Sequence, residues 1–226
     1  MITGAGAGIG RGCALRFGAE GAKVVVADIN AAGAEETARL VGAAGGTAAA
    51  CATDVSSEES VAALAAFAVR TFGAVHVLLN NAAIQVNKTV EDTTLVSGGG
   101  GGAGRSLRAG GRGAARLRGP PLVLCIRLRC CDSRVPGSGA RPTRPPQSQA
   151  EWNREIGVNL GGVFLCSKHF MRHLRATRGN IISMSSVNAT FVEPMCAGYC
   201  ATKAAIIGLT KCARGAVALA AAAGTE

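Results

Sequence analysis

Short apolar runs alternate with longer amphipathic runs over the first 95 residues of the chain. A continuous β-branched run at 23–29, bounded by Gly21 and Asn30, predicts a strand that is buried on both faces. Further strand patterns lie at 46–55, 75–82 and 180–186. Helical patterns occupy 31–44, 56–73, 150–177 and 198–213. The segment at 56–73 opens with serines and glutamates, as helices commonly do, and stops at Gly73.

Regular alternation of strands and helices predicts a parallel doubly wound sheet, here a single Rossmann-like α/β domain. The opening strand is the exception to the pattern. Only three residues, Met1 to Thr3, precede a glycine-rich turn, whereas strands usually run to about five or six residues. We therefore expect most of this strand to be missing and the domain to be incomplete.

The net charge of +10 would suggest a nucleic-acid or anionic-membrane partner if the charge were spread over the chain. Instead, the segment 96–149 holds ten arginines, no lysine and one acidic residue. It also holds six of the seven prolines and 12 of the 32 glycines, so it reads as a basic low-complexity insert. The rest of the chain is nearly neutral, and we expect neither nucleic acid nor a membrane as its partner.

The remaining composition predicts a protein of the cytoplasm. The start lacks the basic and apolar regions of a signal peptide, and no run reaches the roughly 18 apolar residues of a membrane span. Nine cysteines occur without a CxxC pair, which favours free thiols over disulfides or a zinc site. His169 and His173 share a helix face but lack the glutamate of a zinc protease motif, so no metal is expected.

Glycines at every second position follow the strand stub in the sequence TGAGAGIG. Glycine lets the backbone turn tightly and approach a pyrophosphate, which then lies at the amino terminus of the following helix. Asp28 ends the next strand, 18 residues after Gly10, close to the spacing of a carboxylate that binds the adenosine ribose. A carboxylate would repel a 2′-phosphate, so NAD is favoured over NADP. The alternative is an ordinary solvated aspartate at a strand end.

The only tyrosine of the chain, Tyr199, precedes Lys203 by one helical turn. Residues at i and i+4 share a helix face about 5–6 Å apart, so a phenol and an ammonium lie together. A free phenol, with a pKa near 10, is a poor base at neutral pH, and a nearby ammonium stabilises the phenolate. The pair therefore predicts an acid/base device, although a surface pair without a function has the same spacing.

Several motifs, taken in order, resemble those of the short-chain dehydrogenases/reductases. The Ser186…Tyr199-x-x-x-Lys203 pattern, the VNL element with Asn159, and NNAA, where the family usually has NNAG, all match. The glycine turn and the Asp54–Val55 pair match as well. The resemblance implies an NAD-dependent oxidoreductase with Tyr199 as general acid/base, Lys203 on the nicotinamide ribose, Ser186 on the substrate oxygen, and Asn159 anchoring a relay water. The cofactor residues that it implies are Thr3, Gly4, Gly8, Ile9, Gly10, Asp28, Asp54, Val55, Asn81, Ala82, Tyr199 and Lys203.

The resemblance covers 1–95 and 150–211, which we assign to the NAD-binding domain, with an insert at 96–149 and an atypical tail at 212–226. A small alcohol or ketone is the expected substrate, and a homo-oligomer is expected because family members often form dimers or tetramers. Two alternatives stay open. One is a non-catalytic or unstable remnant whose insert is a translated intron, and the other is an arginine-rich RNA-binding protein.

Overall fold

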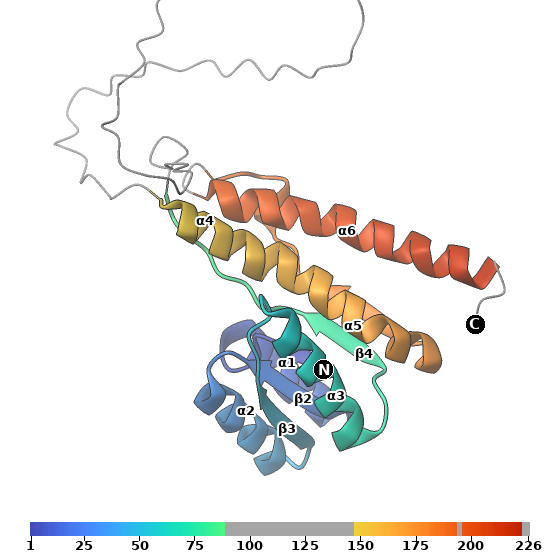
Figure 1. Ribbon diagram of the computed structural model, residues 1–226. Coiled ribbons are helices and arrows are strands. Elements are labelled where there is room, and N and C mark those ends of the chain that lie inside the picture. Colours follow the sequence, from blue (N-terminus) through green and yellow to red (C-terminus); the bar gives the residue numbers. More distant parts are fainter. Residues whose placement is uncertain (89–146, 194–195, 223–226) are drawn as a thin grey trace, which may run out of the picture. The chain divides into compact units, whose positions relative to one another are not determined.

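The computed structural model describes residues 1–88, 147–193 and 196–222. Within them, five parallel strands form one sheet in the order β3-β2-β1-β4-β5 (Figure 1). The strands are β1 Ile2–Thr3, β2 Lys23–Asp28, β3 Thr47–Ala52, β4 Val77–Asn80 and β5 Asn180–Ser183. The helices are α1 Gly8–Ala19, α2 Ala31–Ala43, α3 Glu58–Phe72, α4 Gln149–Ile156, α5 Gly162–Thr177 and α6 Ala197–Ala222. This arrangement confirms the predicted doubly wound α/β class.

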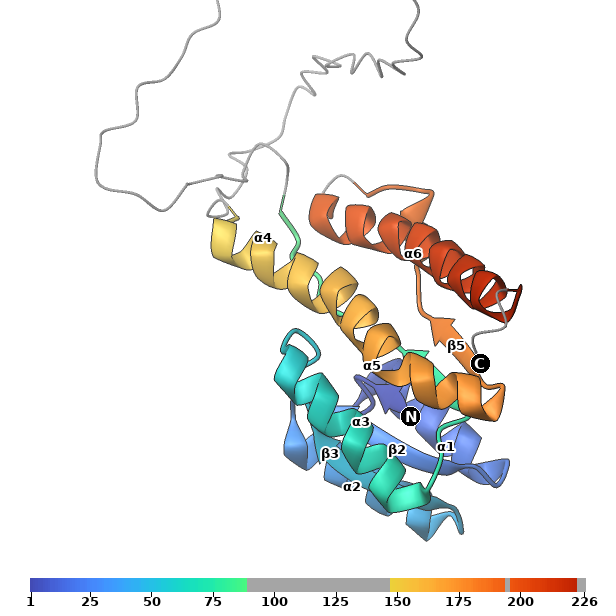
Figure 2. The same cartoon turned by 45° about the vertical axis from the view of Figure 1, so that its right-hand side comes forward.

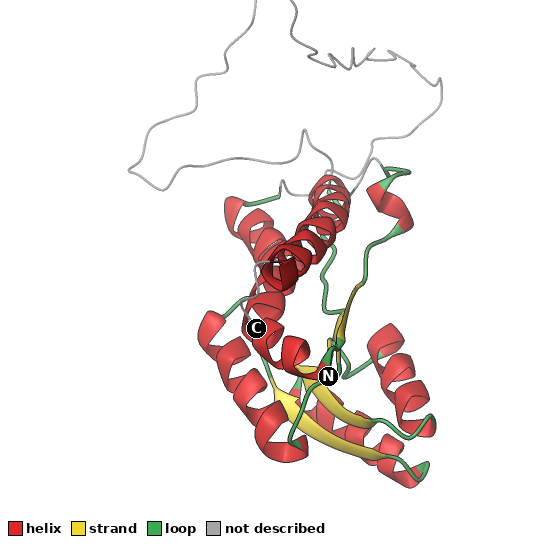
Figure 3. Ribbon diagram, turned by 90° about the vertical axis from the view of Figure 1, so that its right-hand side faces the viewer, coloured by secondary structure: helices red, strands yellow, loops and turns green. Residues whose placement is uncertain are grey.

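Helices cover both faces of the sheet (Figure 3). On one face, Val24 and Val26 of β2 pack in a cluster with Ala14 of α1 and Val41 of α2. On the other face, Val25 packs in a cluster with residues of α3 and α5. The continuous apolar run of β2 is therefore explained, because alternate side chains enter opposite clusters.

Local signals set the ends of the helices. The side chains of Asn30 and Ser57 cap α2 and α3 by accepting backbone N–H groups, and Gly73 ends α3 with a positive φ of 80°. Ser148 and Glu151 form a reciprocal capping box at α4. That helix thus begins at the last residues of the segment predicted as an insert. The rest of the insert, apart from buried Gln147, lies outside the described residues.

The predicted long helix at 150–177 is present but interrupted. A π-helical turn, η1 Gly157–Gly161, joins α4 to α5, and the two helices run nearly in line (Figure 1). The last helix, α6, lies next to them and to the short 3₁₀ segment η2 Val187–Ala189 that follows β5 (Figure 2). Asn159 lies in the π-helical turn, so this irregular element positions a predicted catalytic residue.

The opening strand is as short as expected, yet it lies at the centre of the sheet. β1 pairs with β2 through Ile2–Val26 and Thr3–Ala27, and with β4 through Ile2–Leu79. β2 and β3, in contrast, pair over six residues. The chain turns directly from this central stub into the glycine-rich loop.

Candidate active site

The turn after β1 depends on glycine at defined positions. Gly4 and Gly8 have positive φ angles of 63° and 53°. A Cβ atom on Gly10 would lie 2.1 Å from the carbonyl oxygen of Gly4, and one on Gly4 would lie 2.7 Å from Cα of Ala82. The loop and the amino end of α1 are therefore packed backbone against backbone, as a phosphate-binding turn requires.

Asp28 ends β2 beside this turn. Its two carboxylate oxygens accept hydrogen bonds from the backbone N–H groups of Gly6 (2.8 Å) and Asn30 (2.9 Å). A Cβ atom on Gly6 would lie 2.8 Å from Cγ of Asp28, so the close approach needs glycine. Gly6 is thus a residue of the site that the sequence assignment left out, and the regular spacing of the glycines was the signal for it.

Thr3 and Asn81 join the carboxyl ends of β1 and β4. The Thr3 hydroxyl accepts hydrogen bonds from the backbone N–H groups of Asn81 (3.0 Å) and Ala82 (3.1 Å). The Asn81 amide in turn donates to the carbonyl oxygens of Thr3 and Gly4, at 3.0 Å each. We call this set of contacts the polar clasp. It fixes the start of the glycine turn against β4.

A cavity of about 460 Å³ opens between the glycine turn and the ends of these strands. That volume is in the range of small-molecule and cofactor sites. Six of the twelve predicted cofactor residues line it: Gly4, Asp28, Asp54, Val55, Asn81 and Ala82. Thr3, Gly8, Ile9 and Gly10 build the turn without lining the cavity, and Ile9 is 68% exposed. Arg154 of α4 and Ser56 also line the cavity and were not predicted.

Tyr199 and Lys203 meet on the first turns of α6 as their spacing predicted. The Lys203 ammonium lies 5.4 Å from the centre of the Tyr199 ring and donates a 2.8 Å hydrogen bond to the carbonyl oxygen of Met184. Lys203 is only 3% exposed, and this burial lowers the pKa of its ammonium. A buried ammonium thus lies beside the half-buried ring of Tyr199.

The loop after β5 carries Ser186 to the same helix. The neighbouring Ser185 hydroxyl donates a 2.8 Å hydrogen bond to the Lys203 carbonyl oxygen, which ties the loop to α6. Ser186 itself caps η2, because its hydroxyl oxygen accepts from the backbone N–H of Asn188 at 3.2 Å. Ser186 therefore lies at the start of η2, and Tyr199 and Lys203 lie in α6, with the hydrogen bond from Ser185 to Lys203 joining the two elements.

Asn159 is fully buried and reaches α6 from the π-helical turn. Its amide group exchanges two 2.8 Å hydrogen bonds with the backbone of Ile84, donating to the carbonyl and accepting from the N–H. It also lies 3.3 Å from the hydroxyl of Thr202, which in turn donates to the Tyr199 carbonyl oxygen. Asn159 thus connects the segment after β4 with the helix of Tyr199.

Comparison with known proteins decides the family. The family model for short chain dehydrogenases matches residues 1–97 and 135–220. The chain belongs to the short chain dehydrogenase family. This result confirms the resemblance drawn from the motifs, and the match includes part of the segment predicted as an insert as well as residues beyond Lys211.

Individual members of the short chain dehydrogenase family resemble most of the chain. It is 33% identical to a 3beta-hydroxysteroid dehydrogenase 1 of Eggerthella lenta over 93% of its own length and 61% of the relative. It is 31% identical to a cis-4-hydroxycyclohexanecarboxylate dehydrogenase of Sinomonas cyclohexanicum, over 94% of this chain and 64% of that one. The chain therefore spans a little over three fifths of the length of these curated relatives.

A solved structure gives the same assignment. A 7 alpha-hydroxysteroid dehydrogenase, complexed with NADH and 7-oxo glycochenodeoxycholic acid, superimposes with a TM-score of 0.64 at 27% identity. The alignment covers 92% of this chain and 60% of the other.

In the described part of the chain, no three His, Cys, Asp or Glu side chains gather as metal ligands, and no helix is both long and apolar enough to cross a bilayer.

Proposed function

We propose that this short chain dehydrogenase is an oxidoreductase that interconverts an alcohol and a carbonyl with NAD(H), with Tyr199 as general acid/base. The observation that carries the proposal is the pairing of half-buried Tyr199 with the buried ammonium of Lys203. A second observation supports it, since the cavity at the glycine turn ends at the segment that Asn159 binds.

The residues around that cavity fit a dinucleotide. The close-packed glycines leave backbone at the surface of the turn, and α1 presents its N–H groups there. When bound, the nicotinamide cofactor supplies the site that accepts or donates hydride. Asp28 would hold the adenosine ribose hydroxyls, and its negative charge favours NAD over NADP. Asp54 and Val55, which line the cavity, would contact the adenine, as the family resemblance implies.

Tyr199 would remove the hydroxyl proton of the alcohol as hydride leaves the carbon, and return it in the reverse direction. The Lys203 ammonium stabilises the phenolate form, because an opposite charge nearby favours the ionised state of an acid. Its hydrogen bond to Met184 holds the ammonium in place beside the ring. Lys203 would also bind the hydroxyls of the nicotinamide ribose.

Ser186 and Asn159 would complete the proton path. The Ser186 hydroxyl would bind the substrate oxygen, and its place at the start of η2 fixes its backbone. Asn159 would anchor the relay water, and its hydrogen bonds to Ile84 and Thr202 hold its side chain beside the helix of Tyr199. A π-helical turn alters the i→i−4 ladder and often marks a functional site.

Cyclic secondary alcohols are the first substrates to test. Relatives are named for action on a 3beta-hydroxysteroid, on cis-4-hydroxycyclohexanecarboxylate and on cyclohexanol. These names share a hydroxyl on a saturated ring.

We also propose a cytoplasmic location and a homo-oligomer, both by analogy with the family.

The proposed function is tested by the substitution Tyr199→Phe, which removes one hydroxyl and keeps the ring. We expect turnover of cyclohexanol with NAD to fall by at least about 10²-fold, the usual contribution of a general acid/base. NADH binding, followed by fluorescence titration, should change little. Substantial residual turnover in the variant would exclude Tyr199 as the acid/base.

A thermal melt with and without NADH tests the non-catalytic alternative. A cofactor that binds only the folded chain raises its midpoint. If the chain melts cooperatively and NADH leaves the midpoint unchanged, the cavity at the glycine turn is not a cofactor site.

A further inference from the structure

A buried carboxyl group lies next to the proposed active site and has no part in the proposed reaction. Glu155, in the last turn of α4, is fully buried. Glutamate is seldom buried to this extent unless its carboxyl group is paired. Oε1 of Glu155 accepts a 3.0 Å hydrogen bond from the backbone N–H of Val86. Burial raises the pKa of the carboxyl group, which favours its neutral form.

Glu155 belongs to a regular series of contacts with the segment that follows β4. Side chains at every fourth position of α4 and η1 bind alternate residues of that segment. The pairs are Asn159 with Ile84, Glu155 with Val86, and Glu151 with Lys88. Four residues of a helix rise about 6 Å and two residues of an extended chain about 6.6 Å, so the two spacings match. The segment after β4 is therefore fixed lengthwise against the helix.

The same two helix positions also contact α6. A Cβ atom on Gly198 would lie 2.3 Å from Oε2 of Glu155, so the carboxyl group fills the space in front of this glycine. One turn further along both helices, the Asn159 amide lies 3.3 Å from the Thr202 hydroxyl. Glu155 and Asn159 are four residues apart, as are Gly198 and Thr202. The two contacts therefore lie on consecutive turns of one interface between helices.

These two contacts lie on either side of Tyr199. Gly198 directly precedes Tyr199 in the chain, and the Thr202 hydroxyl donates a 2.8 Å hydrogen bond to the Tyr199 carbonyl oxygen. A single contact would let the first turn of α6 tilt about it, whereas two contacts one turn apart prevent a tilt. The position of the phenol relative to Asn159 thus depends on Glu155 as well.

We propose that Glu155 is a positioning residue of this active site, whose carboxyl group sets the distance between α4 and the first turn of α6 and so aligns Tyr199 with Asn159. This role rests on the proposed function, in which Tyr199 exchanges the proton and Asn159 anchors the relay water. Glu155 does not line the proposed cofactor cavity. A misalignment of about 1 Å can slow a reaction by about 10²-fold, so loss of the carboxyl group should reduce turnover without weakening cofactor binding.

The first test compares Glu155→Ala with Glu155→Gln in the full chain, with cyclohexanol and NAD as substrates. Alanine removes the acceptor of the Val86 N–H and the atoms in front of Gly198, whereas glutamine keeps both and cannot ionise. The stoichiometry of NADH binding gives the concentration of folded protein. We expect kcat of Glu155→Ala to fall at least about 10-fold while the NADH dissociation constant changes less than about twofold. Glu155→Gln should keep most of the kcat.

A second pair of variants approaches the same contact from α6. Gly198→Ala places a methyl group against the carboxyl group of Glu155, whereas Gly208→Ala adds the same methyl group to the same helix where no described atom lies within 4 Å. We expect Gly198→Ala to lower kcat at least about 10-fold with NADH binding retained, and Gly208→Ala to leave kcat unchanged. If one of Glu155→Ala and Gly198→Ala fails to bind NADH, the other pair decides.

Equal kcat values for Glu155→Ala and Glu155→Gln, or for Gly198→Ala and Gly208→Ala, would show that Glu155 does not position Tyr199. Loss of NADH binding in both Glu155→Ala and Gly198→Ala would also contradict this role, because the carboxyl group would then support the fold as a whole. The parent chain is assayed first. A parent that binds NADH without turnover contradicts the proposed function, and the role of Glu155 with it. An active parent whose variants keep their kcat contradicts the role of Glu155 alone.

Discussion

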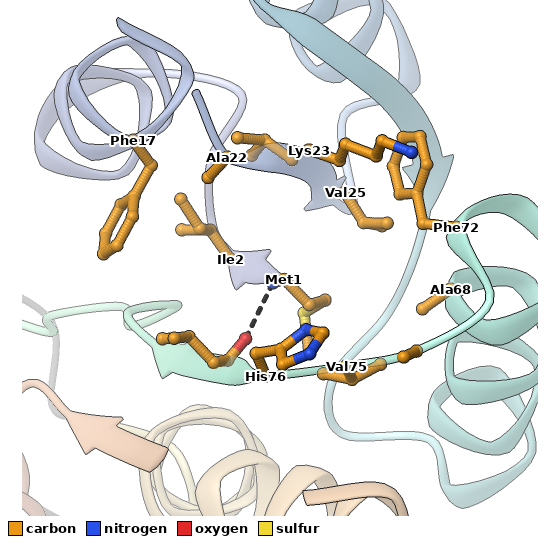
Figure 4. Close-up of a pocket in the computed structure, with 13 residues that line it drawn as sticks. Met1, Ile2, Phe17, Ala22, Lys23, Val25, Ala68, Phe72, Val75 and His76 are labelled. Atoms are coloured by element: carbon orange, nitrogen blue, oxygen red, sulfur yellow. Dashed lines mark hydrogen bonds between the residues drawn. The ribbon is translucent and has the colours of Figure 1, made fainter. Parts of the chain in front are cut away.

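The two ends of β1 have opposite characters, although only two residues separate them. At the carboxyl end, the polar clasp binds the backbone of β4 and the glycine turn through the Thr3 hydroxyl and the Asn81 amide. At the amino end lies a cavity of about 440 Å³ whose lining is apolar except for Lys23 and His76, and the Met1 amine is buried there (Figure 4). At its functional end the strand is therefore held by the side-chain hydrogen bonds of the polar clasp together with the backbone pairing of Thr3 with Ala27.

The two ends of β1 should therefore affect different properties: the position of the glycine turn at one end, and the stability of the fold alone at the other. The polar clasp determines where the glycine turn lies, and so where the proposed cofactor would bind. The cavity at the amino end of β1 shares no lining residue with the proposed cofactor cavity. Changes at the carboxyl end should therefore alter stability and NADH binding together, whereas changes at the amino end should alter stability alone.

Gly10→Ala should have the largest effect at the functional end. The added Cβ would lie 2.1 Å from the Gly4 carbonyl oxygen and 2.6 Å from Nδ2 of Asn81, and backbone cannot move away cheaply. We expect the free energy of unfolding to fall by about 4 kcal/mol, and NADH binding to be lost. Urea denaturation and fluorescence titration measure the two effects.

Gly12→Ala is the matched control for that substitution. Gly12 lies two residues further along α1, and a Cβ atom there would meet nothing within 4 Å. Both substitutions gain the same helix propensity, so Gly12→Ala should be neutral or stabilising by up to about 1 kcal/mol. Equal stability of the two variants would show that the turn is not packed as described.

Much of the fold could be predicted because the signals were local. The continuous apolar run of β2 defined a buried strand, and the serines before α3 and Gly73 after it gave that helix nearly its true bounds. Asp28 could be placed at the cavity because the end of a parallel strand beside a glycine turn is a defined location. Tyr199 and Lys203 came together because helical spacing alone fixes the pair.

The remaining features depend on contacts between distant segments. The π-helical turn at Gly157–Gly161 carries no composition signal, and it places Asn159 against Ile84, 75 residues earlier. The polar clasp joins Thr3 to Asn81, and neither residue indicates the other in the sequence. The cavity at the amino end of β1 could not be predicted, because Phe17 of α1 and Phe72 of α3 line it and only the packing of the two helices brings them together.

Thr3→Val tests the polar clasp with a smaller change. Valine has nearly the shape of threonine but leaves the N–H groups of Asn81 and Ala82 without their acceptor. Each unsatisfied buried group costs about 1–3 kcal/mol, so we expect a loss of about 3 kcal/mol together with weaker NADH binding. Thr3→Ser keeps the hydroxyl, and its loss should be clearly smaller. If the two variants are equally stable, the methyl group of Thr3 matters and the hydroxyl does not.

The smallest expected effect is a pH dependence that arises at the amino end of β1. The pKa of the Met1 amine is about 6 in the folded chain, against 8.0 for an ordinary amino terminus. Between these values the unfolded chain binds the proton and the folded chain does not, so the free energy of unfolding rises with pH. Two pKa units correspond to about 2 to 3 kcal/mol, gained between pH 6 and 8.

Acetylation of Met1 isolates this contribution. Lys23 and His76 also line the cavity at the amino end of β1, but they are present in both forms of the chain, so subtracting the two pH profiles leaves the contribution of the amine alone. The unmodified chain should gain roughly 5 °C in midpoint from pH 6 to pH 8 relative to the acetylated chain. NADH affinity, measured at constant ionic strength, should not change between pH 6 and pH 8 because of this amine. The amine lies at the end of β1 away from the proposed cofactor cavity. Parallel stability profiles would mean that the Met1 amine is solvated, and the two ends of β1 would then differ less than their contacts indicate.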